Sequence, residues 1–272
     1  MVRLCRLAAF VVFTGAASLF AQAPAAPVTP PSTTASDKRL IDLLTAWEKK
    51  MLGMETLVTK CSRNEIEKLN GQKKTFEGRA LFARPNYAQL VMADEKASTW
   101  EKYVSNGVNL YEYLPRSRSI RVHELPKQGL GDNTALSFLF GMKVEDARKR
   151  YTLTLHKEDE SYAYVMIYPK YDGDKQEFKR AQLVLFTKGP SEMMPCRLWF
   201  EAPNGDEATW TFTNPTMNIR MEKKELMKEF EFPGVPKDWT LQKAAVALPD
   251  KDKEMPLPKK GLPEVPPLKA RP

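Results

Sequence analysis

The sequence predicts a mainly β protein of the α+β class, with about ten antiparallel strands in one sheet. Residues 75–82 alternate, so the even-numbered side chains share one apolar face of a strand. Asn70-Gly71 and Asn106-Gly107 are strong hairpin signals, because both residue types tolerate a positive φ. Apolar residues also recur at helical spacing in 37–53 and 133–149. We therefore expect hairpin-connected strands with two helical segments packed against them.

The chain of 272 residues divides into four parts. Residues 1–21 have the basic, apolar and small-residue order of a secretory signal peptide. The Pro-, Ala- and Thr-rich residues 22–36 predict a linker, and the Pro- and Lys-rich residues 244–272 predict a disordered tail. Residues 37–243 remain as one domain, which is long enough to bury a core.

The N-terminal segment predicts the location of the protein. Cleavage after Ala21 would release a soluble periplasmic protein; the alternative is an uncleaved anchor, for which the apolar run Leu7–Phe20 is short. Loss of Arg3 and Arg6, one positive charge each, lowers the formal net charge from +8 to +6. Because both signs of charge are spread along the chain, we expect a solvated surface and no nucleic-acid partner.

The domain is expected to open with a helix and a long strand. Ser36 or Asp37 is suited to cap the helix, and Gly53 to end it. A strand follows from Thr56 to about Leu69. The helical stripe that would face the core comprises Leu40, Leu44, Trp47, Met51 and Met54.

The stretch from 75 to 122 is rich in turn signals. Arg84-Pro85-Asn86 turns the chain, because proline fixes φ and lacks an N–H for the strand ladder. Pro115 ends a later strand in the same way. The strands expected in and around this stretch are 75–82, 87–92, 102–105, 108–113 and 119–124.

The second half begins with a helix that Asn133 is suited to cap and that runs through Met142, followed by a charged helical piece at 144–149. Phe138, Leu139 and Phe140 cannot all face one side of a helix, so two surfaces must cover them. One surface is the sheet; the other is either a ligand or the rest of an ordinary core. Expected strands follow at 151–156, 162–168, 180–187, 197–201 and 208–214, with a helical turn at 225–230.

No arrangement of residues indicates catalysis. His123 and His156 lack neighbours at metal-ligand spacing, so both are expected to be surface imidazoles. Glu158-Asp159-Glu160 is typical of a solvated hairpin tip. No nucleophile elbow, phosphate loop or dinucleotide motif occurs. We therefore expect no enzyme, no cofactor and no metal. Cys61 and Cys196 are either bridged across the sheet or two small buried thiols.

Several motifs, taken in order, resemble the periplasmic outer-membrane lipoprotein carrier LolA and its relatives. They are the strand Gly78–Phe82 ending in Arg84-Pro85-Asn86, the turn Val104–Gly107 and the aromatic strand Leu110–Pro115. Tyr164–Lys170 resembles a later strand of the family. The closing pattern of the family resembles Thr209–Asn214 followed by Phe230, Phe232, Pro236 and Trp239, although Lys237-Asp238-Trp239 replaces its glycine-containing end.

The resemblance implies an open, strongly curved half-barrel, with helices over its concave face as a lid and an acyl chain bound between lid and sheet. It also implies that Arg84 acts as a latch, donating hydrogen bonds to carbonyl groups of the lid, for which a guanidinium is well suited. The expected cavity residues are Phe76, Phe82, Tyr87, Leu90, Met92, Leu110, Tyr111, Tyr113, Phe138, Phe140, Trp210 and Phe212.

The sequence thus favours a monomeric, non-catalytic carrier or chaperone of the periplasm. Its partners would be an acylated lipoprotein or lipid, together with envelope proteins that donate and accept this cargo. Such a protein would take part in outer-membrane biogenesis. The alternative is a sensor or protein-interaction module on the same fold.

Overall fold

The computed structural model describes residues 35–94, 96, 98–125 and 142–243. The first half contains α1 (Ala35–Leu52), β1 (Thr56–Ile66), β2 (Lys73–Ala83), β3 (Tyr87–Asp94), β4 (Thr99–Asn106), β5 (Asn109–Leu114), the 3-10 turn η1 (Pro115–Ser117) and β6 (Ser119–Glu124). The second half contains α3 (Val144–Arg150), β7 (Tyr151–Glu158), β8 (Tyr162–Pro169), α4 (Asp172–Glu177), β9 (Arg180–Phe186), β10 (Pro195–Glu201), β11 (Glu207–Met217), α5 (Lys223–Lys228) and β12 (Thr240–Lys243).

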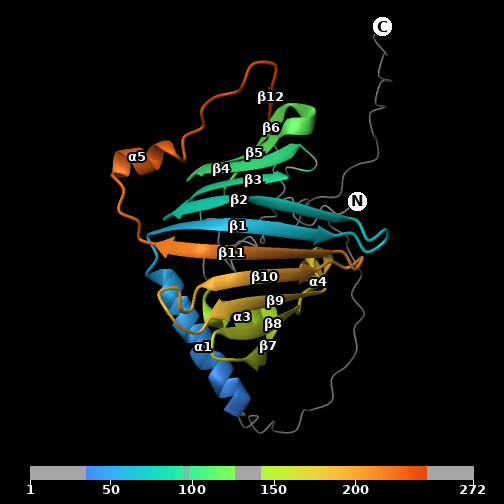
Figure 1. Cartoon of the computed structure of the whole chain (residues 1–272), viewed down its shortest axis with the longest axis vertical. Coiled ribbons are helices and arrows are strands. Elements are labelled where there is room, and N and C mark those ends of the chain that lie inside the picture. The colour runs from blue at the N-terminus through green and yellow to red at the C-terminus, as the bar shows by residue number, and fades with distance from the viewer. Residues whose placement is uncertain (1–34, 95, 97, 126–141, 244–272) are drawn as a thin grey trace, which may run out of the picture.

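All described strands join one 12-stranded sheet in the order β12-β6-β5-β4-β3-β2-β1-β11-β10-β9-β8-β7. The strands at its two ends, β7 and β12, are not neighbours, so the sheet stays open (Figure 1). The prediction of one open, curved sheet with helices is confirmed, with slightly more strands than expected. One of these is β12, which pairs in parallel with β6. Its four side chains are all exposed, so it carries no apolar alternation that would predict a strand.

Strand β1 lies in the middle of the sheet and joins the two halves of the chain. It pairs with β2 on one side and with the late strand β11 on the other. Strands β2–β6 extend from it in one direction, and β11–β7 in the other (Figure 1).

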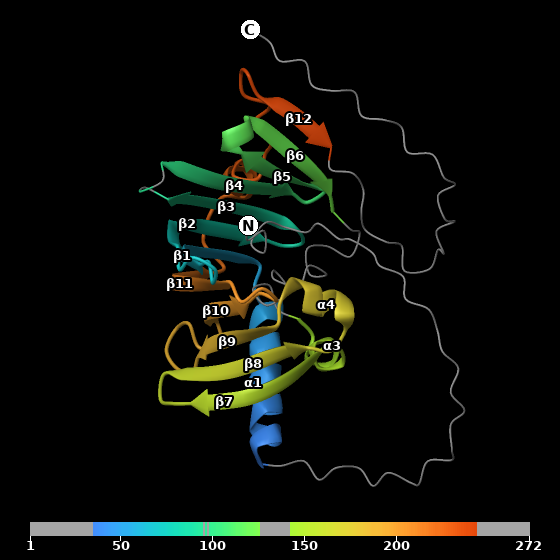
Figure 2. The same cartoon turned by 90° about the vertical axis from the view of Figure 1, so that its right-hand side faces the viewer.

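Helix α1 packs on one face of this sheet, which we call the inner face. Its residues Leu44, Trp47 and Met51 are almost fully buried, as the helical spacing predicts. The helix runs across strands β7–β10 rather than along them (Figure 2). Leu44, Trp47 and Met51 belong to the main hydrophobic cluster of the domain, which we call the inner cluster. This cluster also includes buried side chains from β1, β2, β3 and β7–β11, so α1 covers the centre of the main core.

The opposite, outer face is covered by the C-terminal part of the domain. Leu226 and Phe230, in and just after α5, pack against Leu81 and Ala83 of β2. The following segment, 232–239, continues across the outer face of β4–β6. The helical turn expected at 225–230 therefore exists, but it lies on the outer face and not over the concave one.

Gly78 permits the closest approach between β2 and β3. A Cβ atom at this position would lie 1.9 Å from the Val91 carbonyl oxygen and 2.8 Å from the sulfur of Met92. Any larger residue would therefore push the two strands apart.

Cys61 and Cys196 are free, buried thiols. Burial raises the pKa of Cys61 to about 12 and that of Cys196 to about 11, so both remain protonated near neutral pH. The disulfide is thus absent, and the alternative of two buried thiols is the one observed. The charged helical piece expected at 144–149 is α3. The signal segment, most of the linker, the tail and nearly all of the helix expected over 133–142 lie outside the described residues.

Candidate functional site

The inner face of the sheet is apolar and rich in aromatic and sulfur-containing side chains. Six of the predicted cavity residues belong to its cluster or pack against it: Phe76, Phe82, Leu90, Met92, Trp210 and Phe212. Leu110 is also buried, and pairing through β4 and β3 places it on the same face. Seven of the expected residues therefore share one surface, although they come from four different strands.

Three predicted cavity residues lie on the outer face instead. Tyr87 packs against Phe230, with ring centroids 5.4 Å apart. Tyr111 stacks on Phe232 at 4.2 Å, and Tyr113 belongs to the same outer cluster. Successive residues of a strand point to opposite faces, and here both faces are covered by apolar groups, so alternation alone did not identify the inner one. The predicted cavity residues 138 and 140 lie outside the described part of the chain.

The inner face is closely packed where α1 crosses it. A hollow between β1, β2, β10 and β11 has a volume of only about 10 Å³. Leu57, Phe82, Met194 and Phe212 are among its walls. A site for a drug-sized or lipid ligand needs roughly 300–1,000 Å³. At this hollow, the surrounding side chains therefore leave too little space for such a ligand.

Arg84 contacts the C-terminal end of α1. Its Nε donates to the Met54 carbonyl oxygen at 2.7 Å, and its Nη2 donates to that of Met51 at 2.9 Å. Met51 lies in the last turn of α1, where carbonyl groups have no partner within the helix, and its oxygen also accepts from the Met54 N–H at 3.2 Å. Met54 lies in the turn that follows the helix. A cation there also interacts favourably with the negative end of the helix dipole. Arg84 itself is exposed to solvent at the end of β2, so both bonds lie at the margin of the core.

Asn218 supports the same junction from the other side. Its side-chain oxygen accepts from the Glu55 N–H at 2.8 Å, and its amide nitrogen donates to the Gly53 carbonyl at 3.3 Å. The turn from α1 into β1 is thus held by two polar side chains from distant parts of the sequence. The spacing of polar residues along the chain gave no signal for the contribution of Asn218.

The inner face becomes charged beyond the apolar region. Arg63 is 2% exposed and lies over the rings of Phe76, at 4.3 Å, and Trp210, at 5.2 Å. Two hydrogen bonds of 2.9 and 3.0 Å join its guanidinium to Glu101, and its Nε lies 2.8 Å from Glu65. Phe76 and Trp210 therefore sandwich a buried cation as well as contributing to the apolar surface.

A second buried charge lies near the end of the sheet on β5. Glu112 is fully buried, and its Oε2 lies 3.1 Å from Arg121 and 3.3 Å from His123 Nε2. His123 is therefore part of a half-buried ionic cluster, whereas the sequence predicted a simple surface imidazole. His156 is exposed, as expected. Sequence reasoning missed Arg63 and Glu112, because single charged residues within strand patterns resemble solvent-facing positions.

No metal centre is found within the described ranges, where no group of three or more His, Cys, Asp or Glu side chains could hold an ion. None of the helices in those ranges is both long and apolar enough to cross a membrane.

The fold and this inner face define an open half-barrel protein closed on one side by an N-terminal helix. A scan against protein-family models and a search of curated proteins both gave no match. Solved structures similar to the chain include an uncharacterized conserved protein from Thermus thermophilus, with 9% identity and a TM-score of 0.46 over 75% of this chain and 99% of that one.

Two further similar structures carry descriptive names. One is a LolA superfamily protein from Nitrosomonas europaea, with 9% identity and a TM-score of 0.39 over 69% of this chain and 96% of that one. The other is the Mycobacterium tuberculosis lipoprotein LppX, with 10% identity and a TM-score of 0.37. The match covers 67% of this chain and 99% of that one. At this level of similarity, the function has to be inferred from the residues of the chain itself.

Proposed function

We propose that this protein is an exported, non-catalytic carrier that binds the acyl chains of a lipoprotein or lipid on its inner face, in the periplasm. The observation that carries the proposal is the inner face itself. It is one apolar surface contributed by eight strands, and within the described part of the chain α1 covers its centre. Each acyl CH₂ group transferred there from water would contribute about 0.8 kcal/mol to binding.

The composition of the inner face suits a ligand that enters by displacing side chains. Met51, Met54, Met92 and Met194 are all buried in it. Methionine has three rotatable bonds and a polarizable sulfur, so it repacks around a new apolar group at low cost. The hollow between β1, β2, β10 and β11 measures about 10 Å³, so an acyl chain would have to displace side chains there. Ligand entry then requires α1 to move away from the sheet.

The hydrogen bonds of Arg84 would determine the free energy needed to move α1 away from the sheet. Its two hydrogen bonds hold the last turn of α1 against the end of β2, at the margin of the proposed site. They are formed by an exposed residue and are therefore weaker than buried ones. A latch of this strength would keep the empty site shut and still yield to an acyl chain.

Leu90→Glu is expected to lower the affinity for a fluorescent fatty acid by at least about tenfold. Leu90 packs at the margin of the inner cluster, so a carboxylate there would oppose an acyl chain without entering the fully buried core. Val91→Glu is the matched control, because Val91 is adjacent in β3 but points to the other face and is 38% exposed. Titration with a dansyl-labelled fatty acid, alongside circular dichroism, measures both effects. The carrier function would be rejected if the unmodified protein showed no saturable binding, or if both variants bound equally well.

Arg84→Leu is expected to bind the same fatty acid about fivefold more tightly and to release it more slowly. Loss of the two bonds should destabilise the closed state by about 1 kcal/mol, and the ligand no longer has to overcome that difference. Arg116→Leu, an exposed arginine on η1, is the control for loss of surface charge. Equal binding and release by the Arg84 variant and the unmodified protein would show that Arg84 does not act as a latch.

A further inference from the structure

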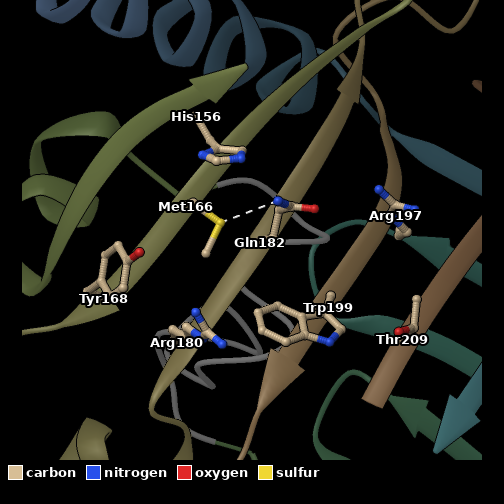
Figure 3. Close-up of a pocket in the computed structure, with 8 residues that line it drawn as sticks. All are labelled: His156, Met166, Tyr168, Arg180, Gln182, Arg197, Trp199 and Thr209. Carbon is tan, nitrogen blue, oxygen red and sulfur yellow. Dashed lines mark hydrogen bonds between the residues drawn. The ribbon is translucent and has the colours of Figure 1, made fainter. Parts of the chain in front are cut away.

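The outer face of β7–β11 carries a trough that the carrier function does not use (Figure 3). Its volume is about 450 Å³. Met166, Gln182 and Thr209 lie along its floor, on β8, β9 and β11. These three residues share one row across the sheet, because Met166 pairs with Gln182, Gln182 pairs with Trp199, and Trp199 pairs with Thr209. The trough therefore crosses the strands.

The sides of the trough are basic and aromatic. Arg197 and His156 lie on one side of the floor row, and Arg180 and Tyr168 lie on the other (Figure 3). None of the eight lining residues is acidic. The side of the trough that holds Arg197 is thus positively charged and complementary to an anionic ligand.

The acidic residues next to the trough are already engaged. Glu201 pairs with Lys179 and Arg180, which lower the pKa of its carboxyl group and keep it ionised. Glu207 accepts a hydrogen bond of 3.0 Å from the Trp199 indole. Glu201 therefore offsets the charge of Arg180, and Glu207 bonds a neutral group, so Arg197 is the cation of the trough that is left to meet a ligand.

Arg197 is the cation best placed to hold a ligand. It is half-buried, and its guanidinium lies 5.9 Å from the ring of Tyr164. Within the described part of the chain it forms no ion pair. Its five donors in a rigid fork match a carboxylate in two-point geometry. A half-buried guanidinium without a carboxylate is better satisfied when a ligand supplies one.

The length of the trough suits an extended chain. It spans five strands, and four spacings of about 4.8 Å give about 19 Å, the length of roughly six residues in extended conformation. The amide of Gln182 contacts only the weakly accepting sulfur of Met166, at 3.3 Å, so it is able to turn toward a peptide backbone. The Arg180 guanidinium lies over the ring of Trp199, 5.3 Å from the ring centroid. It covers the surface on which a sugar would stack, so the trough suits a peptide better than a sugar.

We propose that this outer trough binds an acidic, extended peptide segment of a partner protein, with Arg197 receiving a carboxylate of that segment. The trough lies on the face opposite to the proposed acyl site. A partner would therefore dock without blocking the ligand surface, and the two sites are separable by mutation.

The test measures binding of a fluorescein-labelled peptide of alternating aspartate and tyrosine to the purified protein by fluorescence anisotropy. We expect saturable binding that weakens as salt increases, and at least about tenfold weaker binding by Arg197→Gln. Lys224→Gln on α5, which removes an equal charge from an exposed position outside the trough, is expected to bind as the unmodified protein does. His156→Gln, at an exposed position, provides a second variant that should keep the fold and bind more weakly.

Two probes complete the test. The same peptide with asparagine in place of aspartate should not bind, and neither should an alginate oligosaccharide, which is a polyanionic sugar. The proposal is overturned if the acidic peptide fails to bind, if alginate binds in its place, or if Lys224→Gln loses as much affinity as Arg197→Gln. Fatty-acid binding measured on the same variants should stay unchanged, which separates this proposal from the carrier function.

Discussion

Trp47→Ala is expected to lower the free energy of unfolding by about 3–5 kcal/mol. Trp47 is the largest side chain that α1 contributes to the core, and it is 1% exposed. Its removal leaves a cavity between helix and sheet that the surrounding strands cannot fill, because they are fixed by their own pairing. Chemical denaturation followed by circular dichroism measures the change.

Trp47→Phe serves as the matched control. The indole nitrogen of Trp47 has no hydrogen-bond partner among the described residues, so phenylalanine removes a buried donor that is not satisfied. We expect the free energy of unfolding to fall by less than about 1.5 kcal/mol, because most of the aromatic side-chain volume is kept. If Trp47→Ala cost no more than Trp47→Phe, α1 would not be part of the cooperative core, contrary to its packing here.

Arg63→Met is expected to lower the free energy of unfolding by about 3–5 kcal/mol, even though methionine suits an apolar core. The change leaves Glu101 and Glu65 next to each other on the inner face, with exposed side-chain fractions of only 18% and 16%. Two poorly solvated carboxylates without their shared cation repel each other and lose their hydrogen bonds. The same denaturation experiment applies.

A double-mutant cycle separates the ion pair from simple packing. Glu101→Gln removes one negative charge and keeps the shape of the side chain. Combined with Arg63→Met, it should recover part of the lost stability, because fewer unpaired charges remain. Strictly additive losses would mean that Arg63 and Glu101 are not energetically coupled, and that their two hydrogen bonds contribute nothing beyond packing.

Most of the secondary structure was predictable, because its signals are local. The Asn106-Gly107 hairpin joins β4 to β5, and the helical stripe around Trp47 forms the buried side of α1. Such patterns depend on residues within one or two turns of each other, so a single sequence contains them. β12 escaped clear prediction because it has no buried side, and its pairing with β6 depends on the fold around it.

The candidate site was predictable only in part. Phe76, Phe82 and Met92 were correctly expected to share one surface, but Tyr111 and Tyr113 face the other way. In β5 the residues on both faces are buried, so the strand lacks the polar side that usually marks the outside. Only the segment 232–239, which packs on one of the two faces, distinguishes them.

The sequence by itself determined the strands, their hairpins, the helix that opens the domain and the position of Arg84 after β2. The tertiary structure decided which carbonyl groups Arg84 meets, and that Arg63 lies between the rings of Phe76 and Trp210. It also decided that Arg197 shares a trough with His156. The physical reason is that strand pairing brings together residues far apart in the chain, and their contacts depend on register and curvature, which no local pattern encodes.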